Sequence, residues 1–541
     1  MSDEKHVDAI VVGAGFSGLY MLKKLRDELG LDVVLFDKAG DVGGTWYWNR
    51  YPGALSDTEA YLYVYSWDKE LLQEHAITHH YANQPTIMGY LNKVADRHDL
   101  RKNIVFNTGI SSALYDEKNG LWHITTDKND DYTCRHFVTA LGLLSASNIP
   151  NIEGRETFKG KSYHSAQWPE GVNLEGKKVG VIGTGSTGTQ IITAIAPVVG
   201  ALTVFQRSAQ YTVPAGNGPV SEEYEKAIKE NYDEVWEGVW NSSLGFGLNE
   251  TSRSIHDVSE EERDAIFQQA WKKGGGFRFM FETFGDIATD EVANKYAQDF
   301  IRRKIREIVK DPVTAEKLCP KDLYAKRPIC DSGYYSVYNQ DNVSLVDVKA
   351  NPIKRITPNG ILTEDGVEHA LDVIIFATGF DAVDGNYTKF EVRGRGGKDL
   401  KEHWKEGPSS YLGMFNNGYP NMYMVLGPNG PFSNLPPAIE LEVRFISDLI
   451  KHAEEQGFST VEATDEAVST WSDACDEIAH MTLFPKAESW IFGANIPGKK
   501  NQVYFYMGGI KAFKEALERT KHNGYEGLML TYANVEKAGT A

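Results

Sequence analysis

Cysteine is scarce in this chain. Its 541 residues include four cysteines, which stand far apart and never in a C-x-x-C spacing. A disulfide framework or a zinc ribbon needs paired or closely spaced cysteines, so we expect neither of them and no metal site. A reduced, cytoplasmic environment fits this cysteine usage best.

Long apolar runs and excess positive charge are also missing. The opening residues, MSDEKHVDAIVVGAG, carry charges that do not fit a signal peptide, and no run reaches transmembrane length. Lys and Arg number 56 against 75 Asp and Glu, a formal net charge of −19. Such a balance disfavours nucleic acid and acidic lipid as partners. We therefore expect small-molecule partners, no membrane and a monomer, although the residues themselves leave the oligomeric state open.

The most informative features of the sequence are two glycine-rich turns. Residues 13–18 and 183–188 both have the spacing G-x-G-x-x-G, after the apolar segments 8–12 and 178–182. Each turn follows a β-branched strand and opens an apolar helix, the context in which such a turn binds the pyrophosphate of a dinucleotide. Because a chain of this length needs more than one domain, we predict an α/β fold with two doubly wound, Rossmann-like dinucleotide-binding domains.

The residue at the end of the second strand differs between the two units. Asp37 and Arg207 stand at the same distance after the first glycine of their turns. An acid there accepts hydrogen bonds from ribose hydroxyls, whereas an arginine suits a 2′-phosphate. The second site is therefore predicted to bind NADP(H) rather than NAD(H), with a solvated surface charge as the alternative for Arg207. Asp37 alone leaves the first site open between NAD and FAD.

Proline is absent between Pro219 and Pro312, where charged and aromatic residues dominate. Ser259 and Glu262 have capping-box spacing, and residues 300–309 carry apolar side chains at helical intervals. We predict a helical insertion over residues 216–321. A separately folding domain is less favoured, because strand signals return at 343–346 and 372–376. The tail after about Val535 is expected to be mobile.

A second glycine loop at 41–46 and a late apolar strand ending in Ala377-Thr378-Gly379 resemble the FAD domain of two-dinucleotide-binding flavoproteins. The resemblance implies FAD at the first site. It divides the chain into an FAD-binding domain (1–140 and 380–541), an NADP-binding domain (141–215 and 322–379) and the helical insertion (216–321). The redox-active cysteine pair of disulfide reductases is missing, which leaves an oxygen-using branch.

Residues 158–169 have the pattern F-x-G-x-x-x-H-x-x-x-W-P, and residues 43–57 read GGTWYWNRYPGALSD. Both segments resemble motifs of the Baeyer–Villiger monooxygenases, and the similarity to that family extends over essentially the whole chain. The pocket segments are most similar to those of the members that act on cyclohexanone. The resemblance implies a cytoplasmic FAD enzyme that uses NADPH and O2. A C4a-peroxyflavin would attack a cyclic ketone and give an ester or lactone through a tetrahedral (Criegee) intermediate, with sulfoxidation as a side activity. The alternatives are an N- or S-oxygenating flavin monooxygenase and a non-enzymatic redox sensor.

The same resemblance assigns the site residues. Arg327 matches the catalytic arginine, whose permanent charge keeps the peroxide deprotonated, and Asp57 matches the carboxylate that orients it. His164, in the fingerprint, is interpreted as structural rather than as a general base. Trp490 matches a tryptophan on a mobile loop that closes over the nicotinamide, although a lone tryptophan is more often core.

The cofactor and substrate residues implied by the resemblance form three sets. For FAD they are Gly13, Gly15, Phe16, Ser17, Gly18, Asp37, Lys38, Gly44, Thr45, Trp46, Asp57, Tyr63, Ile110, Thr378 and Gly379. For NADP they are Gly183, Thr184, Gly185, Ser186, Thr187, Gly188, Gln190, Arg207, Ser208, Lys326, Arg327 and Trp490. For the ketone they are Leu143, Leu144, Phe246, Phe277, Phe432, Ser433, Leu435 and Phe505, any of which is ordinary core material when taken alone.

Overall fold

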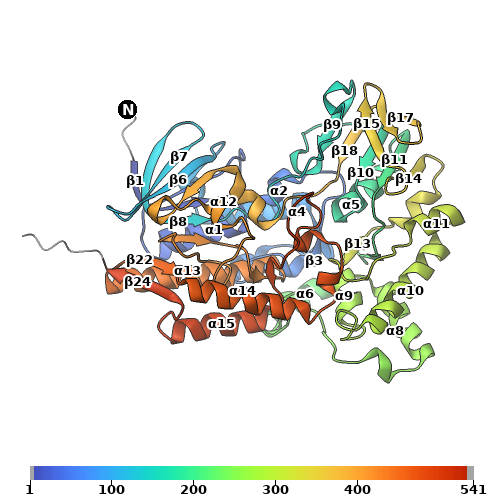
Figure 1. Ribbon diagram of the computed structural model, residues 1–541. Coiled ribbons are helices and arrows are strands. Elements are labelled where there is room, and N and C mark those ends of the chain that lie inside the picture. Colours follow the sequence, from blue (N-terminus) through green and yellow to red (C-terminus); the bar gives the residue numbers. More distant parts are fainter. Residues whose placement is uncertain (1–4, 533–541) are drawn as a thin grey trace, which may run out of the picture.

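A computed structural model describes residues 5–532 of the chain. Two β-sheets occupy opposite halves of the molecule, and helices pack on their faces (Figure 1). The predicted α/β fold with two doubly wound, dinucleotide-binding units is confirmed. The tail after Val535, predicted to be mobile, lies outside the described residues.

The first sheet has eight strands in the order β19-β6-β7-β8-β1-β2-β5, with β20 paired to β8. Its centre is parallel, since β1 pairs in parallel with both β2 and β8, while β6, β7 and β8 form an antiparallel meander. The strands are β1 (Lys5–Val12), β2 (Val33–Phe36), β5 (Ile104–Val105), β6 (Ile110–Asp116), β7 (Leu121–Thr126), β8 (Asp131–Thr139), β19 (Glu391–Arg393) and β20 (Met422–Met424).

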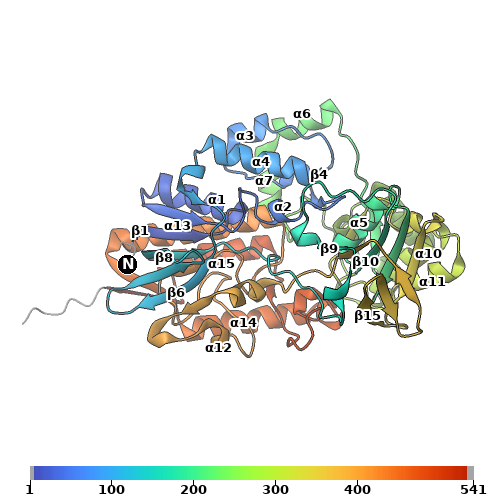
Figure 2. The same ribbon diagram turned by 90° about the horizontal axis from the view of Figure 1, so that it is seen from above.

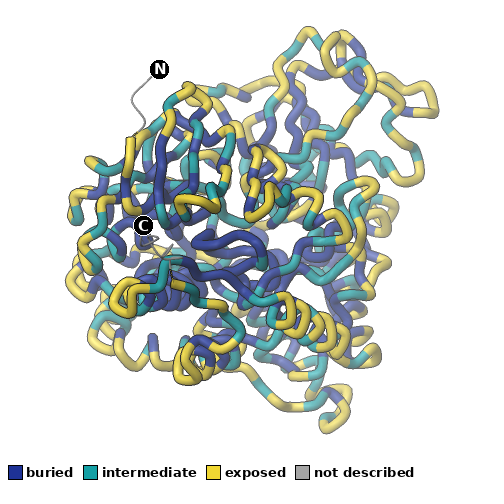
Figure 3. Tube along the Cα trace, turned by 60° about the vertical axis from the view of Figure 1, so that its left-hand side comes forward, coloured by how far each residue is buried: buried dark blue, intermediate teal, exposed yellow. Residues whose placement is uncertain are grey.

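Alternate residues of β1 face opposite cores, as the two-residue period of a strand requires. Ala9 and Val11 pack into the core shared with helices α1 (Phe16–Lys23) and α13 (Leu435–Gln456), whereas Ile10 packs on the other side. Figure 3 shows that buried chain segments concentrate in the interior of the molecule. The apolar helix expected after the first glycine turn begins at Phe16 and continues after α1 as a π-helical turn over Lys24–Glu28.

The second sheet is fully parallel, in the order β14-β11-β10-β18-β9. Figure 2 shows its strands β9 and β10 in the half of the molecule opposite β1, β6 and β8 of the first sheet. Its strands are β9 (Lys161–His164), β10 (Lys178–Ile182), β11 (Ala201–Gln206), β14 (Val343–Asp347) and β18 (Val373–Phe376), and α5 (Ser186–Ile195) follows the glycine turn. The inner strands β10 and β18 are buried on both faces, which explains their apolar sequences, whereas the edge strands β9 and β14 are partly exposed.

Six α-helices lie between β11 and β14 in sequence. They are α6 (Glu222–Glu230), α7 (Tyr232–Trp240), α8 (Glu260–Lys273), α9 (Gly276–Phe281), α10 (Glu291–Ile308) and α11 (Pro312–Leu318). Ser259 caps α8 by accepting the Glu262 N–H at 3.2 Å, and the helix expected over 300–309 is the last part of α10. Phe267 and Ile301 share one apolar core with Val179 of the second sheet, so α8 and α10 do not build a core of their own.

The remaining elements connect the two sheets or cover the first one. They are α2 (Thr45–Trp48), β3 (Leu55–Glu59), α3 (Lys69–Glu74), β4 (Tyr81–Asn83), α4 (Gln84–Arg97), β12 (Thr212–Pro214), β13 (Ile329–Asp331), β15 (Ile353–Thr357), β16 (Gly360–Thr363), β17 (Glu368–Ala370), α12 (Leu400–His403), β21 (Gly430–Pro431), β22 (Phe458–Ala463), α14 (Asp465–His480), β23 (Phe505–Tyr506), α15 (Ile510–His522) and β24 (Leu528–Tyr532). Across residues 5–532, no helix has both the length and the apolar character needed to cross a membrane.

Candidate active site

Both glycine turns have the geometry of a dinucleotide cradle. Gly13 and Gly183 have φ of +110° and +106°, and a Cβ on them would come within 2.3 and 2.4 Å of a backbone carbonyl oxygen. A Cβ on Gly18 or Gly188 would collide with the carbonyl of the first glycine in its own turn. No side chain caps the N-terminus of α1 or α5, and the Cα of Gly185 faces open space. The free N–H groups therefore suit a pyrophosphate in both places.

The two strand ends differ as their residue types require. Asp37 accepts the N–H groups of Ala14 and Ala39 at 2.5 and 2.7 Å, which fixes its carboxylate beside the first turn. Burial raises the pKa of Asp37, and these two hydrogen bonds act against that shift. Arg207 is exposed at the end of β11 and makes no ion pair with any residue of the described chain. An unpaired guanidinium at this rim suits a phosphate.

A second loop closes over the first glycine turn. The Gly43 N–H donates to the Ala14 carbonyl oxygen at 2.9 Å, and a Cβ on Gly44 would lie 2.8 Å from the Cα of Gly15. Trp46, on α2, donates its indole N–H to the Tyr63 hydroxyl at 3.1 Å. Burial raises the pKa of Tyr63 to about 12, so this hydroxyl stays protonated. These contacts hold the predicted FAD residues of α2 and β3 next to the first turn.

Gln190 of α5 joins the two halves of the molecule. Its side-chain amide donates to the Leu55 carbonyl oxygen at 2.9 Å and accepts the Tyr51 hydroxyl at 2.8 Å. A Cβ on Gly53 would lie 2.7 Å from the backbone oxygen of Gln190. The segment that leads into β3 therefore packs directly on the helix of the second dinucleotide unit.

Arg327 and Asp57 meet at this junction although 270 residues separate them in the chain. The Nη2 of Arg327 lies 2.7 Å from each carboxylate oxygen of Asp57, and its Nε lies 3.2 Å from Oδ2. The side chains are 29% and 20% exposed. Burial acts to lower the pKa of Arg327, but the Asp57 charge and hydrogen bonds outweigh it and raise that pKa. The result is a permanent, oriented cation in a partly enclosed site.

The predicted pocket aromatics form two groups, one of which lies beside this cation. The Arg327 guanidinium lies 5.3 Å from the centroid of the Phe277 ring, which stacks on Phe246 at 4.3 Å. In the second group, Phe505 lies 5.6 Å from Phe432 and 6.2 Å from Trp490.

The other predicted pocket residues lie on three segments. Leu143 and Leu144 follow β8 and pack against the core of the second sheet. Leu435 is the first residue of α13, and the hydroxyl of Ser433 donates to the Asn434 carbonyl oxygen at 3.3 Å. Trp490 begins a single 3-10 turn, Trp490–Phe492, and is half-buried.

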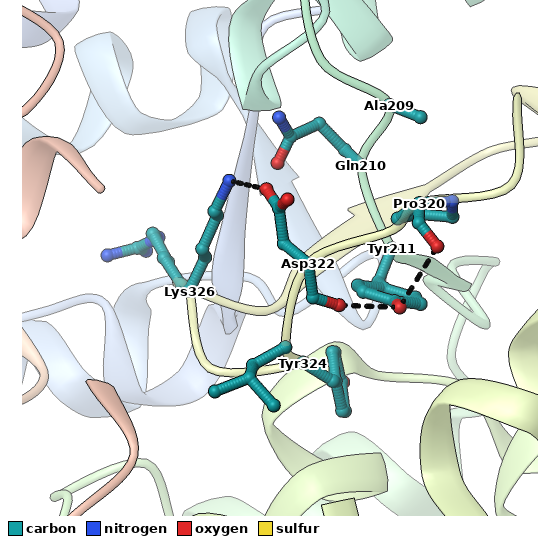
Figure 4. A pocket seen from close by; sticks show the side chains of 9 residues that line it. Ala209, Gln210, Tyr211, Pro320, Asp322, Tyr324 and Lys326 are labelled. Carbon is teal, nitrogen blue, oxygen red and sulfur yellow. Dashed lines mark hydrogen bonds and ion pairs between the residues drawn. The ribbon is translucent and has the colours of Figure 1, made fainter. Parts of the chain in front are cut away.

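Lys326 lines a small cavity with Ala209 and Gln210, which directly follow the strand-end segment of Arg207 (Figure 4). Its ammonium group lies 2.6 Å from the Asp322 carboxylate. The Tyr211 hydroxyl donates to the Asp322 carbonyl oxygen at 2.8 Å and holds the loop that carries Lys326. The segment that follows Arg207 and the loop that carries Lys326, both in the predicted NADP set, thus line one cavity.

His164 ends β9 and is buried. Its Nδ1 accepts the N–H of Ala166 at 3.1 Å, and burial lowers its pKa. This hydrogen bond gives the ring a local structural role. Within residues 5–532, no group of three or more His, Cys, Asp or Glu side chains is arranged to hold a metal ion, and the four cysteines are free.

Sequence reasoning missed one buried ion pair beside the site, Glu59 with Arg278. Glu59 stands two residues after Asp57 on β3, so a strand prediction there would place both carboxylates on one face. The partner on α9 carried no sequence signal, because a lone arginine in an aromatic helix has many possible contacts.

Comparison with known proteins agrees with this geometry. Residues 4–213 match the family described as Flavin-binding monooxygenase-like. The chain is 60% identical over 527 residues to a cyclohexanone 1,2-monooxygenase of Acinetobacter sp, covering 97% of each chain. It is 54% identical to the phenazine N-monooxygenase PhzNO1 of Lysobacter antibioticus, covering 98% of each.

Among solved structures, it superimposes on the NADP+-bound crystal structure of cyclohexanone monooxygenase from Rhodococcus sp. Phi1. The TM-score is 0.97 at 55% identity, covering 98% of this chain and all of the other. Full-length similarity at this identity, together with the two dinucleotide cradles and the arginine between them, shows that this chain belongs to the Baeyer–Villiger monooxygenase family.

Proposed function

We propose that this protein is a Baeyer–Villiger monooxygenase of the cyclohexanone monooxygenase type, which uses NADPH and O2 to convert cyclic ketones to lactones. The observation that carries the proposal is the Arg327–Asp57 pair, held beside apolar rings where the two dinucleotide units meet. A cyclic aliphatic ketone needs an apolar cavity with one group that stabilises charge on its oxygen. Sulfides are expected as secondary substrates.

FAD and NADPH are the cofactors, and the described residues fit both. FAD would be held by the first turn, Asp37, Lys38, α2, Tyr63, Ile110 and the 378–379 linker. NADP would be held by the second turn, Thr184 to Gln190, Arg207, Ser208, Lys326 and Trp490. Gly379 has φ of +76° and open space at its Cα, which allows a ligand to approach the backbone. When bound, the two groups together supply the hydride and the activated oxygen atom.

Arg327 would act on the ketone through its charge. Negative charge moves onto the carbonyl oxygen as the carbonyl carbon is attacked, and a fixed guanidinium stabilises that charge. Because its pKa is raised further by Asp57, Arg327 gives up no proton to a basic neighbour. Asp57 is the positioning partner, since it accepts hydrogen bonds from both Nη2 and Nε and so fixes the guanidinium plane.

The apolar rings and the Trp490 turn would exclude water. Phe432 and Phe505 bring aromatic surface toward Trp490, which supports a role for the 490–492 turn in covering the nicotinamide end. Exclusion of water protects a reactive oxygen donor from breakdown before the ketone reacts. The pocket set completes this enclosure with Leu143, Leu144, Phe246, Phe277, Ser433 and Leu435.

The first sheet with residues 1–140 and 380–541 would form the FAD domain, and the second sheet with 141–215 and 322–379 the NADP domain. The 216–321 insertion would close one side of the pocket through Phe246 and Phe277. A monomer of 60.4 kDa is proposed, and light scattering after size-exclusion chromatography tests it. A cytoplasmic location stays a prediction from the sequence.

The test is product analysis with the purified, FAD-loaded protein. Cyclohexanone, NADPH and O2 should yield ε-caprolactone, with one NADPH consumed for each lactone, and omission of NADPH should abolish the product. Absence of lactone from a protein that holds FAD and oxidises NADPH would overturn the proposal. A yellow protein that oxidises no NADPH with any ketone would instead support a redox sensor.

N-oxygenation is a second candidate, because a relative 54% identical to this chain is a phenazine N-monooxygenase. Phenazine incubated under the same conditions would give an N-oxide, which mass spectrometry distinguishes from a lactone. We expect the lactone activity to have the higher kcat/KM. The reverse order would make N-oxygenation the main function.

A further inference from the structure

Strand β3 presents two carboxylates to the rest of the molecule. Asp57 and Glu59 are two residues apart, so they extend from the same face of the strand. Asp57 pairs with Arg327, and Glu59 pairs with Arg278 of α9. The side chains of Glu59 and Arg278 are 13% and 14% exposed, which makes this second pair more enclosed than the first.

Further contacts fix the second pair. The Tyr224 hydroxyl donates to the other carboxylate oxygen of Glu59 at 3.1 Å. The Nη1 of Arg278 donates to the Gly274 carbonyl oxygen at 3.2 Å, and its Nε lies 3.2 Å from the Glu282 carboxylate. Burial acts to lower the pKa of Arg278, but the Glu59 charge outweighs it and raises that pKa. Arg278 therefore stays charged, and these contacts join β3, α6 and α9.

Helix α9 carries the ring that lies against Arg327. Phe277 immediately precedes Arg278, and its ring stacks on Phe246 and faces the Arg327 guanidinium. The helix has only six residues and follows two glycines with φ of +82° and +96°. Such a short helix after a flexible turn depends on tertiary contacts for its position. Arg278 supplies the charged contact on the side that faces β3.

We propose that Glu59 and Arg278 are a positioning pair that sets the Phe277 ring against Arg327 and thereby determines which side of an unsymmetrical ketone migrates. The inference rests on the proposed lactone-forming function. Neither residue touches the reacting atoms, so both act through Phe277. The orientation of a substituted ring in the pocket is decided by the surface of Phe277 and Phe246.

The test compares Glu59→Gln, Arg278→Gln, the double variant and Arg278→Lys, using racemic 2-methylcyclohexanone and unsubstituted cyclohexanone. The readouts are the ratio of regioisomeric lactones, the enantiomeric excess, and kcat and KM separately. FAD content and melting temperature are measured for each variant. Lys69→Met is the matched control, because the Lys69–Asp233 pair also joins the N-terminal half to the inserted helices but is 60% and 91% exposed.

We expect each glutamine variant to shift the regioisomer ratio by at least about threefold, and the double variant to shift it no further. Arg278→Lys should return the ratio toward that of the parent, and Lys69→Met should leave it unchanged. A lower melting temperature with an unchanged ratio in both glutamine variants would overturn the proposal, as would an equal shift in the control. If Arg278→Gln loses FAD, the regioisomer ratio of the isosteric Glu59→Gln variant tests the proposal instead. Parent protein without lactone product would instead refute the proposed function.

Discussion

Replacing Arg327 by alanine removes the one cation that the proposed chemistry requires. The guanidinium is held by Asp57 through contacts of 2.7, 2.7 and 3.2 Å, so it is preorganised toward the site before any substrate arrives. Loss of one such preorganised donor lowers kcat by roughly 10²- to 10³-fold, or about 3–4 kcal/mol of transition-state stabilisation. Because the missing donor is also charged, we expect the upper end of that range.

The same change has a smaller effect on folding. Breaking a fully buried ion pair costs about 3–5 kcal/mol, but these side chains are 29% and 20% exposed, and water can solvate the remaining carboxylate. We therefore expect about 1–2 kcal/mol of lost stability. The glycine turns are untouched, so the variant should retain FAD and should still be reduced by NADPH.

The assay measures lactone by gas chromatography, NADPH loss by absorbance and hydrogen peroxide by a coupled peroxidase. NADPH oxidation without lactone, with peroxide as the product, is the expected pattern. Arg393→Ala is the control, since its ion pair with Glu391 is exposed on the far sheet edge. Lactone formation within about tenfold of the parent rate, by a variant with full FAD content, would refute the assigned role of Arg327.

Three further predictions follow from other contacts. Arg207→Ala should lower kcat/KM for NADPH about tenfold and leave kcat/KM for NADH unchanged, because an exposed charge-assisted hydrogen bond to a phosphate contributes energy at the weak end of the range for such bonds. Steady-state kinetics with both cofactors measures this change. An unchanged preference for NADPH over NADH would contradict the role assigned to Arg207 at the strand end. Trp490→Ala should raise the peroxide formed per NADPH roughly two- to fivefold, because the 490–492 turn would no longer exclude water; unaltered coupling would remove the lid role. Burial raises the pKa of Glu442 from 4.5 to about 8, and the Leu426 N–H acts against this shift. The folded state then holds a proton that the unfolded state has released between those two pH values, so stability should fall as pH rises through that window, by up to about 1 kcal/mol per unit. Melting temperatures at pH 6 and 8 should fall less for Glu442→Gln than for the parent, and equal losses would show that Glu442 does not titrate there.

Local sequence was sufficient to predict the cofactor-binding frame. A glycine turn between a β-branched strand and an apolar helix depends on contacts within about thirty residues, so its geometry can be read from spacing. Asp37 and Arg207 belong to the same local units, and their positions at the strand ends follow from them. The precise course of this helix was less predictable, since a π-helical turn follows α1 over Lys24–Glu28.

Contacts between residues far apart in the chain could not be predicted from local sequence. Nothing in the local sequence of Asp57 or Arg327 specifies a 2.7 Å contact across 270 positions; only resemblance to a family pointed to it. The Glu59–Arg278 pair had no such support and was not predicted.

By itself, the sequence therefore determined two dinucleotide units and the phosphate preference of the second, because strand, turn and helix are set by neighbours along the chain. The tertiary structure alone decided which carboxylate of β3 faces which arginine, and which aromatic rings lie over the guanidinium. Those contacts depend on how the two sheets and the inserted helices pack together, and many side chains of the same type satisfy the same local pattern.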